Sequence, residues 1–200
     1  MSDTDREERR RQIIDAVIRT TTTGGLQAAT FRSIAKEAGV SVRLVQYYFG
    51  TKDELLADTL VEVGKRSVER ISHTMSTLGP DPSPKDKIAT IFEQFLPIDE
   101  PRREAMLVFI ALRTASLTDP SLRTSDRAGL DRSLIQTVQT ELERAVADGD
   151  ARPGLDPHSE AVMLVGTMTG IANGLLAGTF TKDEGQGSLD YAIDLSIPGD

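Results

Sequence analysis

The sequence predicts an all-α protein. Apolar residues return every three or four positions in one segment after another, as in Ile13, Ile14 and Val17, and this is the spacing of an amphipathic helix. No stretch of useful length alternates between apolar and polar residues, which is the pattern of a half-buried strand. Segments rich in glycine and proline, such as residues 79–84 (GPDPSP), separate the helical patterns.

Residues 30–52 (TFRSIAKEAGVSVRLVQYYFGTK) contain two short helical patterns joined by a glycine turn. In the first pattern, Ala35 is small enough for a second helix to approach closely. Gly39 follows, and glycine adopts the positive φ of a helix end without a Cβ clash. Ser41 is a favourable N-cap, because its hydroxyl can accept a backbone N–H of a helix over residues 42–48. Two helices, a short turn with glycine and a capped second helix indicate a helix-turn-helix.

The second helix of this pair is expected to expose residues that suit DNA. Lys52 follows the helix, where a phosphate could lie. Spacing alone fits an ordinary αα-hairpin equally well, since such hairpins are common in helical bundles. The position near the N-terminus, behind one basic helix, favours DNA binding. The exposed residues that could meet base edges or phosphates are Ser41, Arg43, Gln46 and Tyr47.

This stretch resembles the DNA-binding domain of the TetR family of bacterial repressors. The matching residues extend over about a quarter of the chain, and their order and spacing are specific. The chain departs from the family at Gln46, where the family usually has tyrosine. The residues that carry the resemblance are Thr30, Ile34, Ala35, Ala38, Gly39, Val40, Ser41, Tyr48, Phe49, Lys52, Glu54, Leu55 and Leu56.

The resemblance implies two domains. Residues 1–52 would form a three-helix DNA-binding domain with the helix-turn-helix, and residues 53–200 would bind an effector and dimerise. The homodimer would bind a palindromic operator in double-stranded DNA. A small-molecule effector would move the helix that starts near Asp53 and so separate the recognition helices beyond the half-site spacing of about 34–36 Å. The candidate DNA-binding residues are Thr30, Arg32, Ser41, Val42, Arg43, Gln46, Tyr47, Tyr48 and Lys52.

The net charge of −8 is unevenly distributed along the chain. Residues 1–52 carry +3 and the remainder carries −11, which indicates a DNA-facing head and an acidic body that phosphate would repel. The charge of the head is modest, which favours a dimer that doubles the contacts. A first helix is expected over residues 5–22. Its arginines fit either phosphate contacts or a solvated helix face; they are Arg9, Arg10, Arg11 and Arg19.

Several classes of function lack support in the sequence. The chain has no cysteine, so it has no disulfide, thiolate metal site or cysteine nucleophile. The N-terminal MSDTDREERRR has no apolar run after its charges, so we expect no signal peptide and a cytoplasmic protein. His73 and His158 are too far apart to suggest a metal site, and no HExxH, P-loop or GxSxG motif is present. We expect neither an enzyme nor a cofactor. The competing hypothesis is a helical ligand-binding or scaffolding module whose helix-turn-helix is only a packing motif.

Further helices are expected over residues 53–78, 86–96, 102–117 and 121–148. Pockets between helices are mostly apolar with few polar groups. Arg113 could anchor an effector in such a pocket, or it could pair with an acid at the surface. The candidate effector-binding residues are Phe92, Phe95, Met106, Phe109, Ile110, Arg113, Met163, Thr167 and Asn173.

Residues 159–180 carry a glycine at every fourth position from Gly166 to Gly178. Glycine inside a helix costs about 0.5–1 kcal/mol, and close approach of another helix would explain the stripe. The uncharged run is long enough to span a membrane, but its threonines, glycines and asparagine favour a buried interface helix. We expect a break at residues 185–187 and a short helix over residues 188–197. In the TetR family the last two helices form the four-helix bundle of the dimer, so the candidate interface residues are Leu164, Gly166, Gly170, Ile171, Gly174, Leu175, Gly178, Tyr191 and Leu195.

Overall fold

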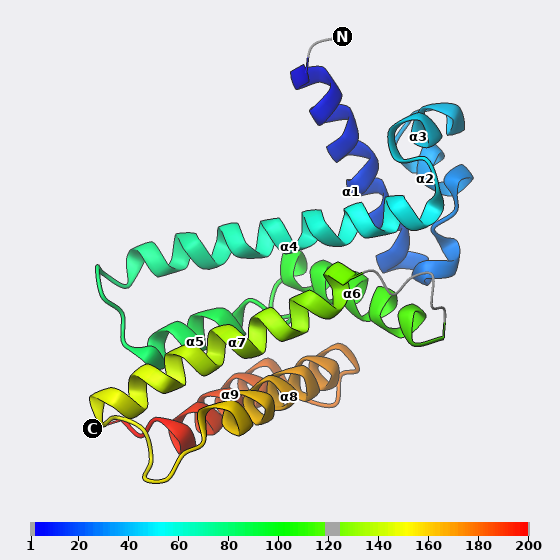
Figure 1. The fold of residues 1–200 in the computed structure, drawn as a ribbon. Coiled ribbons are helices and arrows are strands. Elements are labelled where there is room, and N and C mark those ends of the chain that lie inside the picture. The colour runs from blue at the N-terminus through cyan, green and yellow to red at the C-terminus, as the bar shows by residue number, and fades with distance from the viewer. Residues whose placement is uncertain (1–2, 119–124, 200) are drawn as a thin grey trace. The chain divides into compact units, whose positions relative to one another are not determined.

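The structure is a computed structural model that describes residues 3–118 and 125–199, with side chains for residues 4–115 and 132–199. The regular secondary structure of the described residues is helical, without a strand, which confirms the predicted fold class. The helices are α1 (Asp3–Ala28), α2 (Phe31–Glu37), α3 (Val42–Phe49), α4 (Lys52–Thr77), α5 (Pro84–Glu93), α6 (Glu100–Thr118), α7 (Ser125–Asp148), α8 (Pro157–Leu176) and α9 (Lys182–Ser196) (Figure 1).

The chain divides into two compact units. The first unit contains the chain up to Arg66 and the segment that begins at Glu104. The second unit contains Ser67–Arg103 and the chain from Ser125 onward. Helices α4 and α6 therefore contribute residues to both units. The functional boundary after residue 52 stays a prediction, and the first half of α4 belongs to the same compact unit as the N-terminal helices.

The first unit has a core to which α1, α2, α3, α4 and α6 all contribute. The helical spacing seen in the sequence places one face of each helix inside. Burying a large aliphatic side chain stabilises a fold by about 1.5–3 kcal/mol, so this core holds the two short helices α2 and α3 in place. Its most deeply buried members include Ile13, Val17, Ile34, Val45, Leu55, Val108 and Leu112.

Helix α1 is longer than the sequence predicts. Its expected end lies near residue 22, but helical structure continues to Ala28. The glycine pair still interrupts it, because Gly25 has φ 72° and ψ 175°, outside the helical region. Only glycine adopts such a conformation without strain. The predicted break is therefore present within α1, and one more turn follows it.

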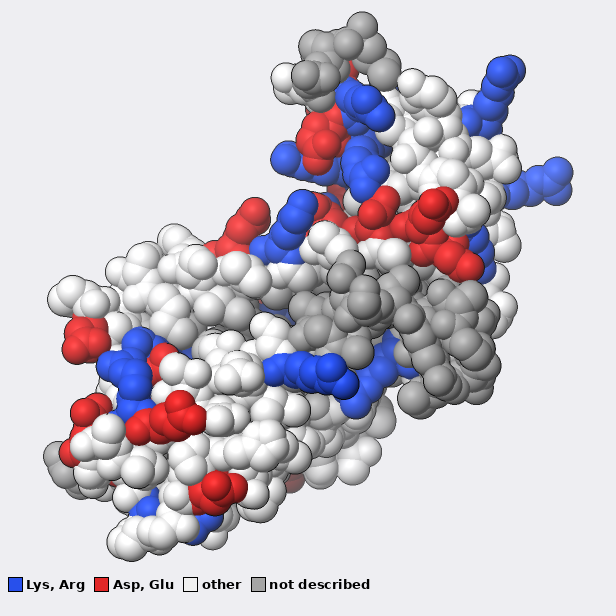
Figure 2. Space-filling model, in the orientation of Figure 1, with Lys and Arg blue, Asp and Glu red and all other residues white. Residues whose placement is uncertain are grey.

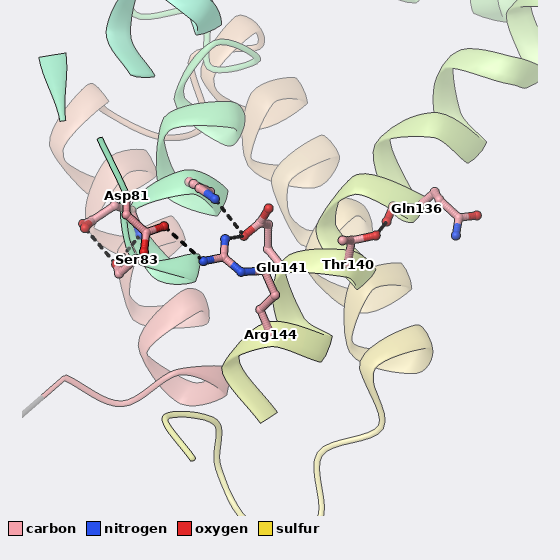
Figure 3. Close-up of polar contacts among 8 residues, drawn as sticks. Asp81, Ser83, Gln136, Thr140, Glu141 and Arg144 are labelled. Carbon is pink, nitrogen blue, oxygen red and sulfur yellow. Dashed lines mark hydrogen bonds and ion pairs between the residues drawn. The ribbon is translucent and has the colours of Figure 1, made fainter. Parts of the chain in front are cut away.

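In the second unit, α8 packs against both α7 and α9, and α5 packs against α7 and α9 (Figure 1). A polar cluster joins α7 to the segment before α5 (Figure 3). Arg144 donates to Glu141 Oε2 at 2.7 Å and to Asp81 Oδ1 at 3.4 Å. Lys87 of α5 lies 3.6 Å from the same Glu141 oxygen. Opposite charges thus connect the N-terminal end of α5 with the side of α7.

The end of the chain differs from the sequence-based expectation. Helix α8 ends at Leu176, so Gly178 lies beyond it, with φ 71°. The predicted break at residues 185–187 is wrong, because α9 already begins at Lys182. Thr181 caps this helix and Glu184 completes a capping box. Gly185 lies inside α9, where a Cβ atom would come within 2.9 Å of Leu175, so the glycine permits close packing of α8 and α9.

The sequence predicts a start of α7 near residue 121, and residues 119–124 lie outside the described part of the structure. Within the described residues, the apolar stretches of all the helices are too short or too polar to cross a membrane. The same residues contain no group of His, Cys, Asp and Glu side chains that could hold a metal ion.

Candidate nucleic-acid interface

Helix α2 begins with an N-cap at Thr30. The hydroxyl of Thr30 accepts a hydrogen bond from the backbone N–H of Ser33 at 3.2 Å. In return, the hydroxyl of Ser33 accepts one from the backbone N–H of Thr30 at 2.9 Å. Both exposed backbone donors at the start of the helix are therefore satisfied. The helix presents Arg32 to solvent and buries Ile34 and Ala35.

The turn between α2 and α3 depends on Gly39. Its φ is 63°, in the left-handed region, and open space surrounds the position of a Cβ atom. The glycine is therefore required by backbone conformation and not by packing. The backbone N–H of Val40 returns to the carbonyl of Ala35 at 2.9 Å. Ser41 then caps α3 by accepting a hydrogen bond from the N–H of Leu44 at 3.2 Å.

Helix α3 has one buried and one exposed face. Val45 and Phe49 are 0% and 4% exposed and hold the helix against the core. On the other face, Tyr47 is 70% exposed and Val42 is 37% exposed, and Arg43 and Gln46 are also exposed. These four residues share the outer surface of one short helix. They offer a cation, an amide, a phenol and a small apolar group, which are the groups that read base edges and backbone in DNA.

Tyr48 and Lys52 occupy less open positions. Both are half-buried. The ring of Tyr48 meets the ring of Tyr47 edge to face, with centroids 5.5 Å apart. Lys52 is the first residue of α4, where Thr51 and Glu54 form a second capping box. The backbone N–H and the hydroxyl of Thr51 both donate to Glu54, which lowers the pKa of this carboxyl.

Three arginines of α1, namely Arg9, Arg10 and Arg19, make contacts within the first unit. Arg19 pairs with Glu37 at 2.7 Å, and Arg9 donates to Gln12 at 2.7 Å. Arg10 pairs with Asp58 of α4 at 2.6 Å, and its guanidinium lies 4.8 Å from the centre of the Phe49 ring. The contact of Arg10 with α3 and α4 could not be found in the sequence, because Asp58 lies 48 positions further along the chain.

Charges of both signs share the surface of this unit. Figure 2 shows Lys and Arg side chains that project into solvent, with Asp and Glu side chains between them. On the face drawn in Figure 2, the modest charge of +3 for residues 1–52 therefore does not form one purely basic patch. Each copy of the chain can neutralise only a few phosphates, and binding energy must come from several contacts together.

The candidate effector-binding residues are divided between the two units. In the first unit, Met106 of α6 is buried and Arg113 is exposed, with its guanidinium 5.9 Å from the Phe109 ring centre; Ile110 is half-buried. In the second unit, Phe92 is buried and Phe95 is half-buried. The three candidates on α8 are exposed: Met163, Thr167 and Asn173.

The candidate dimer residues separate into an inner and an outer set. Leu164 and Ile171 are buried within the chain itself. Gly166 and Gly170 are exposed, and apart from their own turns of α8 no atom of the described residues lies within 4 Å of a Cβ placed on either. On α9, Tyr191 and Leu195 are 65% and 54% exposed. Gly174 and Leu175 contact their own chain, because a Cβ on Gly174 would overlap Phe180 and Leu175 packs on Gly185. Gly178 lies beyond the end of α8, with φ 71°.

Comparison with known proteins agrees with this geometry. Residues 13–59 match the family described as bacterial regulatory proteins of the tetR family. Residues 84–197 match the family described as the C-terminal part of BetI-type transcriptional repressors. The chain belongs to the TetR family. It is thus a DNA-binding, ligand-responsive transcriptional regulator and not an enzyme.

Individual relatives of this TetR-family chain support the assignment over most of its length. The regulator BetI of Stenotrophomonas maltophilia is 29% identical over 189 residues, which cover 92% of this chain and 93% of the relative. The regulator PksA of Bacillus subtilis is 36% identical over 107 residues, and the match spans about half of each protein. A transcriptional regulator of Saccharomonospora viridis, solved in complex with choline, has the same fold with a TM-score of 0.78, 21% identity and 94% of each chain covered.

Proposed function

We propose that this chain is a repressor that binds a palindromic operator as a homodimer and leaves it when a small molecule binds. The observation that carries the proposal is the exposed face of α3, where Arg43, Gln46 and Tyr47 project from a helix anchored by Val45 and Phe49. A helix of this kind fits the major groove of B-DNA. Val42, Arg43, Gln46 and Tyr47 would lie near base edges or backbone, and Thr30, Arg32, Ser41, Tyr48 and Lys52 would mainly hold phosphates.

The homodimer would form through the exposed face of α8 and α9. Gly166 and Gly170 leave the α8 backbone open to a partner helix, and Tyr191 and Leu195 provide exposed apolar surface on α9, which packs against α8. Contiguous apolar surface marks association sites, and Tyr191 and Leu195 lie four residues apart on α9, where helical spacing brings side chains together. In a two-fold symmetric dimer the same surface serves both subunits, and two recognition helices would then meet half-sites about 34–36 Å apart.

The effector is a small molecule bound by the α-helical body. Because a structurally similar regulator was solved with choline, choline is the first compound to test. The charge of −11 carried by residues 53–200 is compatible with a cationic ligand. Thermal melting with choline, against trimethylamine and ethanolamine as controls, would report binding as a rise in Tm.

Fluorescence anisotropy tests DNA binding directly. Labelled DNA from immediately upstream of the gene is titrated with protein at two salt concentrations, with random DNA as competitor. Tight binding that resists the competitor is the expected result, and it supplies the assay for effector release. If that DNA binds no better than random DNA, selection from a random-sequence library follows. If no sequence is enriched, the proposed operator binding is wrong.

A further inference from the structure

Arg10 joins three helices of the first unit at one point. Its guanidinium donates to Asp58 Oδ2 on α4 at 2.6 Å and lies over the ring of Phe49, the last residue of α3, 4.8 Å from the ring centre. Cations over an aromatic face are attracted by the negative charge of the ring. The side chains of Arg10 and Asp58 are 34% and 36% exposed, so water only partly screens the pair.

Other contacts hold α1 at the same time to α2 and to a later turn of α4. The side-chain amide of Gln12 donates to the carbonyl of Ala38 at 2.8 Å, at the end of α2. Arg66 of α4 pairs with Asp15 of α1 at 2.8 Å and with Glu62 at 3.1 Å. Asp58 and Arg66, eight residues apart on α4, therefore both hold α4 against α1. The Arg10 contact is the one that also touches α3.

The contacts of Arg10 separate it from an ordinary phosphate-binding arginine. Its hydrogen bond to Asp58 neutralises its charge locally, and its guanidinium carbon lies over the ring of Phe49. Phe49 is 4% exposed and anchors the C-terminal end of α3 in the core. A group that rests on Phe49 and is fixed by α4 restrains the direction in which α3 leaves the core.

We propose that the Arg10–Asp58 pair is a positioning clasp that sets the orientation of the recognition helix α3 for DNA. This inference rests on the proposed operator binding and adds to it the residues that align the reading helix. Its distinctive consequence is that Asp58, an acidic residue that phosphate would repel, raises DNA affinity. Asp58 acts only through Arg10 and Phe49, and Arg10 acts through Phe49 and not through a phosphate.

The test compares Arg10→Gln, Asp58→Asn, the double variant and the charge exchange Arg10→Asp with Asp58→Arg. Operator affinity is measured by anisotropy over a range of salt concentrations, at a temperature well below the Tm of each variant. Both single variants should lose affinity by about five- to tenfold, since a partly exposed pair of modest strength acts once in each subunit of the dimer. The double variant should lose no more than either single variant, and the charge exchange should recover part of the affinity.

The salt dependence separates the clasp from a phosphate contact. A clasp leaves the slope of log affinity against log salt unchanged in all four variants. If Arg10 held a phosphate, Arg10→Gln would lower the slope by about one unit for each phosphate that is no longer neutralised, and Asp58→Asn would raise affinity by removing a negative charge. Either result would overturn the proposal.

Glu37→Gln provides the matched control, because it breaks the pair of Arg19 with Glu37, a hydrogen-bonded ion pair of similar length in the same unit that does not touch α3. It should leave affinity unchanged, and a loss as large as that of Asp58→Asn would overturn the specific role of the clasp. If the unaltered protein binds no selected sequence, the proposed operator binding has failed. If it binds and the clasp variants bind equally well, only the inference has failed.

Discussion

Ser196, in the last turn of α9, donates a buried hydrogen bond to Glu160 Oε1 of α8 at 2.6 Å. The other carboxylate oxygen of Glu160 accepts from Arg152 at 2.6 Å. The Glu160 side chain is 7% exposed, so its charge is kept in the interior by these two partners. A buried carboxylate requires such partners, because the protein interior solvates charge poorly. The contact fixes the end of α9 to the start of α8.

Ser196→Ala should destabilise the protein by about 1–3 kcal/mol, because it leaves one oxygen of a buried carboxylate without its hydrogen bond. Urea unfolding at pH 7 measures the change. Ser188→Ala is the control, since Ser188 lies exposed on the same helix and its loss should change stability by less than about 0.5 kcal/mol. Equal stability of both variants would show that the buried hydrogen bond contributes nothing.

Lys52→Ala should weaken binding to operator and random DNA by the same factor. A lysine that holds a phosphate contributes charge but no sequence information, so its removal should lower the salt slope by about one unit for each phosphate that it neutralised. Anisotropy titrations at several salt concentrations measure both quantities. Arg132→Ala is the control, because Arg132 is exposed on α7 of the second unit. An unchanged slope in Lys52→Ala would mean that Lys52 does not contact a phosphate.

Leu195→Asp should dissociate the proposed dimer, because two-fold symmetry places the new charge in the interface twice. Sedimentation velocity at micromolar concentration should show a shift from dimer to monomer, and operator affinity should fall with it. Val68→Asp is the matched control, since Val68 is 60% exposed on α4. If Leu195→Asp remains a dimer, the subunits associate through another surface.

A fall in pH should remove the stabilisation of the folded state that the capping carboxylates provide. Hydrogen bonds from Thr51 lower the pKa of Glu54, and those from Thr181 lower the pKa of Glu184; hydrogen bonds from Ser159 lower the pKa of Asp156. A carboxyl whose pKa is lower in the folded state stabilises above its unfolded pKa, about 3.9 for Asp and 4.3 for Glu, and loses this effect as pH falls through the folded value.

Glu184→Gln isolates one of these caps. Glutamine keeps the shape and an acceptor but carries no charge, so the variant should be less stable than the unaltered protein at pH 7. Urea unfolding between pH 7 and pH 3 should show the difference shrinking once the pH falls below about 4.3. A difference that stays constant over this range would show that the charge of Glu184 is not responsible.

Features set by neighbouring residues could be predicted from the sequence. Ser41 caps the helix that the sequence predicts it to cap, and Gly39 has the expected positive φ, because a cap or a turn depends on residues within one helical turn. The exposed face of α3 follows from the same local spacing. The helix cap, the turn and the exposed positions of α3 could therefore be predicted from the sequence alone.

Features that depend on residues far apart in the chain could not be predicted from the sequence. Gly185 and Gly187 suggest a break, but the capping box of Thr181 and Glu184 starts α9 earlier and Gly185 packs beneath Leu175. Leu164 and Ile171 share the apolar pattern of a dimer helix, yet their own chain covers them. In the sequence Arg10 is one member of an arginine run, and only the fold reveals its partners Asp58 and Phe49.

In the proposed dimer, the side-chain-free strip at Gly166 and Gly170 would have a consequence for a cell that produces several related regulators at once. A partner helix can come close to this strip only if its residues at the facing positions are also small. A paralogue with a bulky residue there would be held away and could not reach Tyr191 and Leu195. If the dimer forms through this strip, the two glycines would disfavour mixed dimers, because specificity depends as much on excluding wrong partners as on binding the right one.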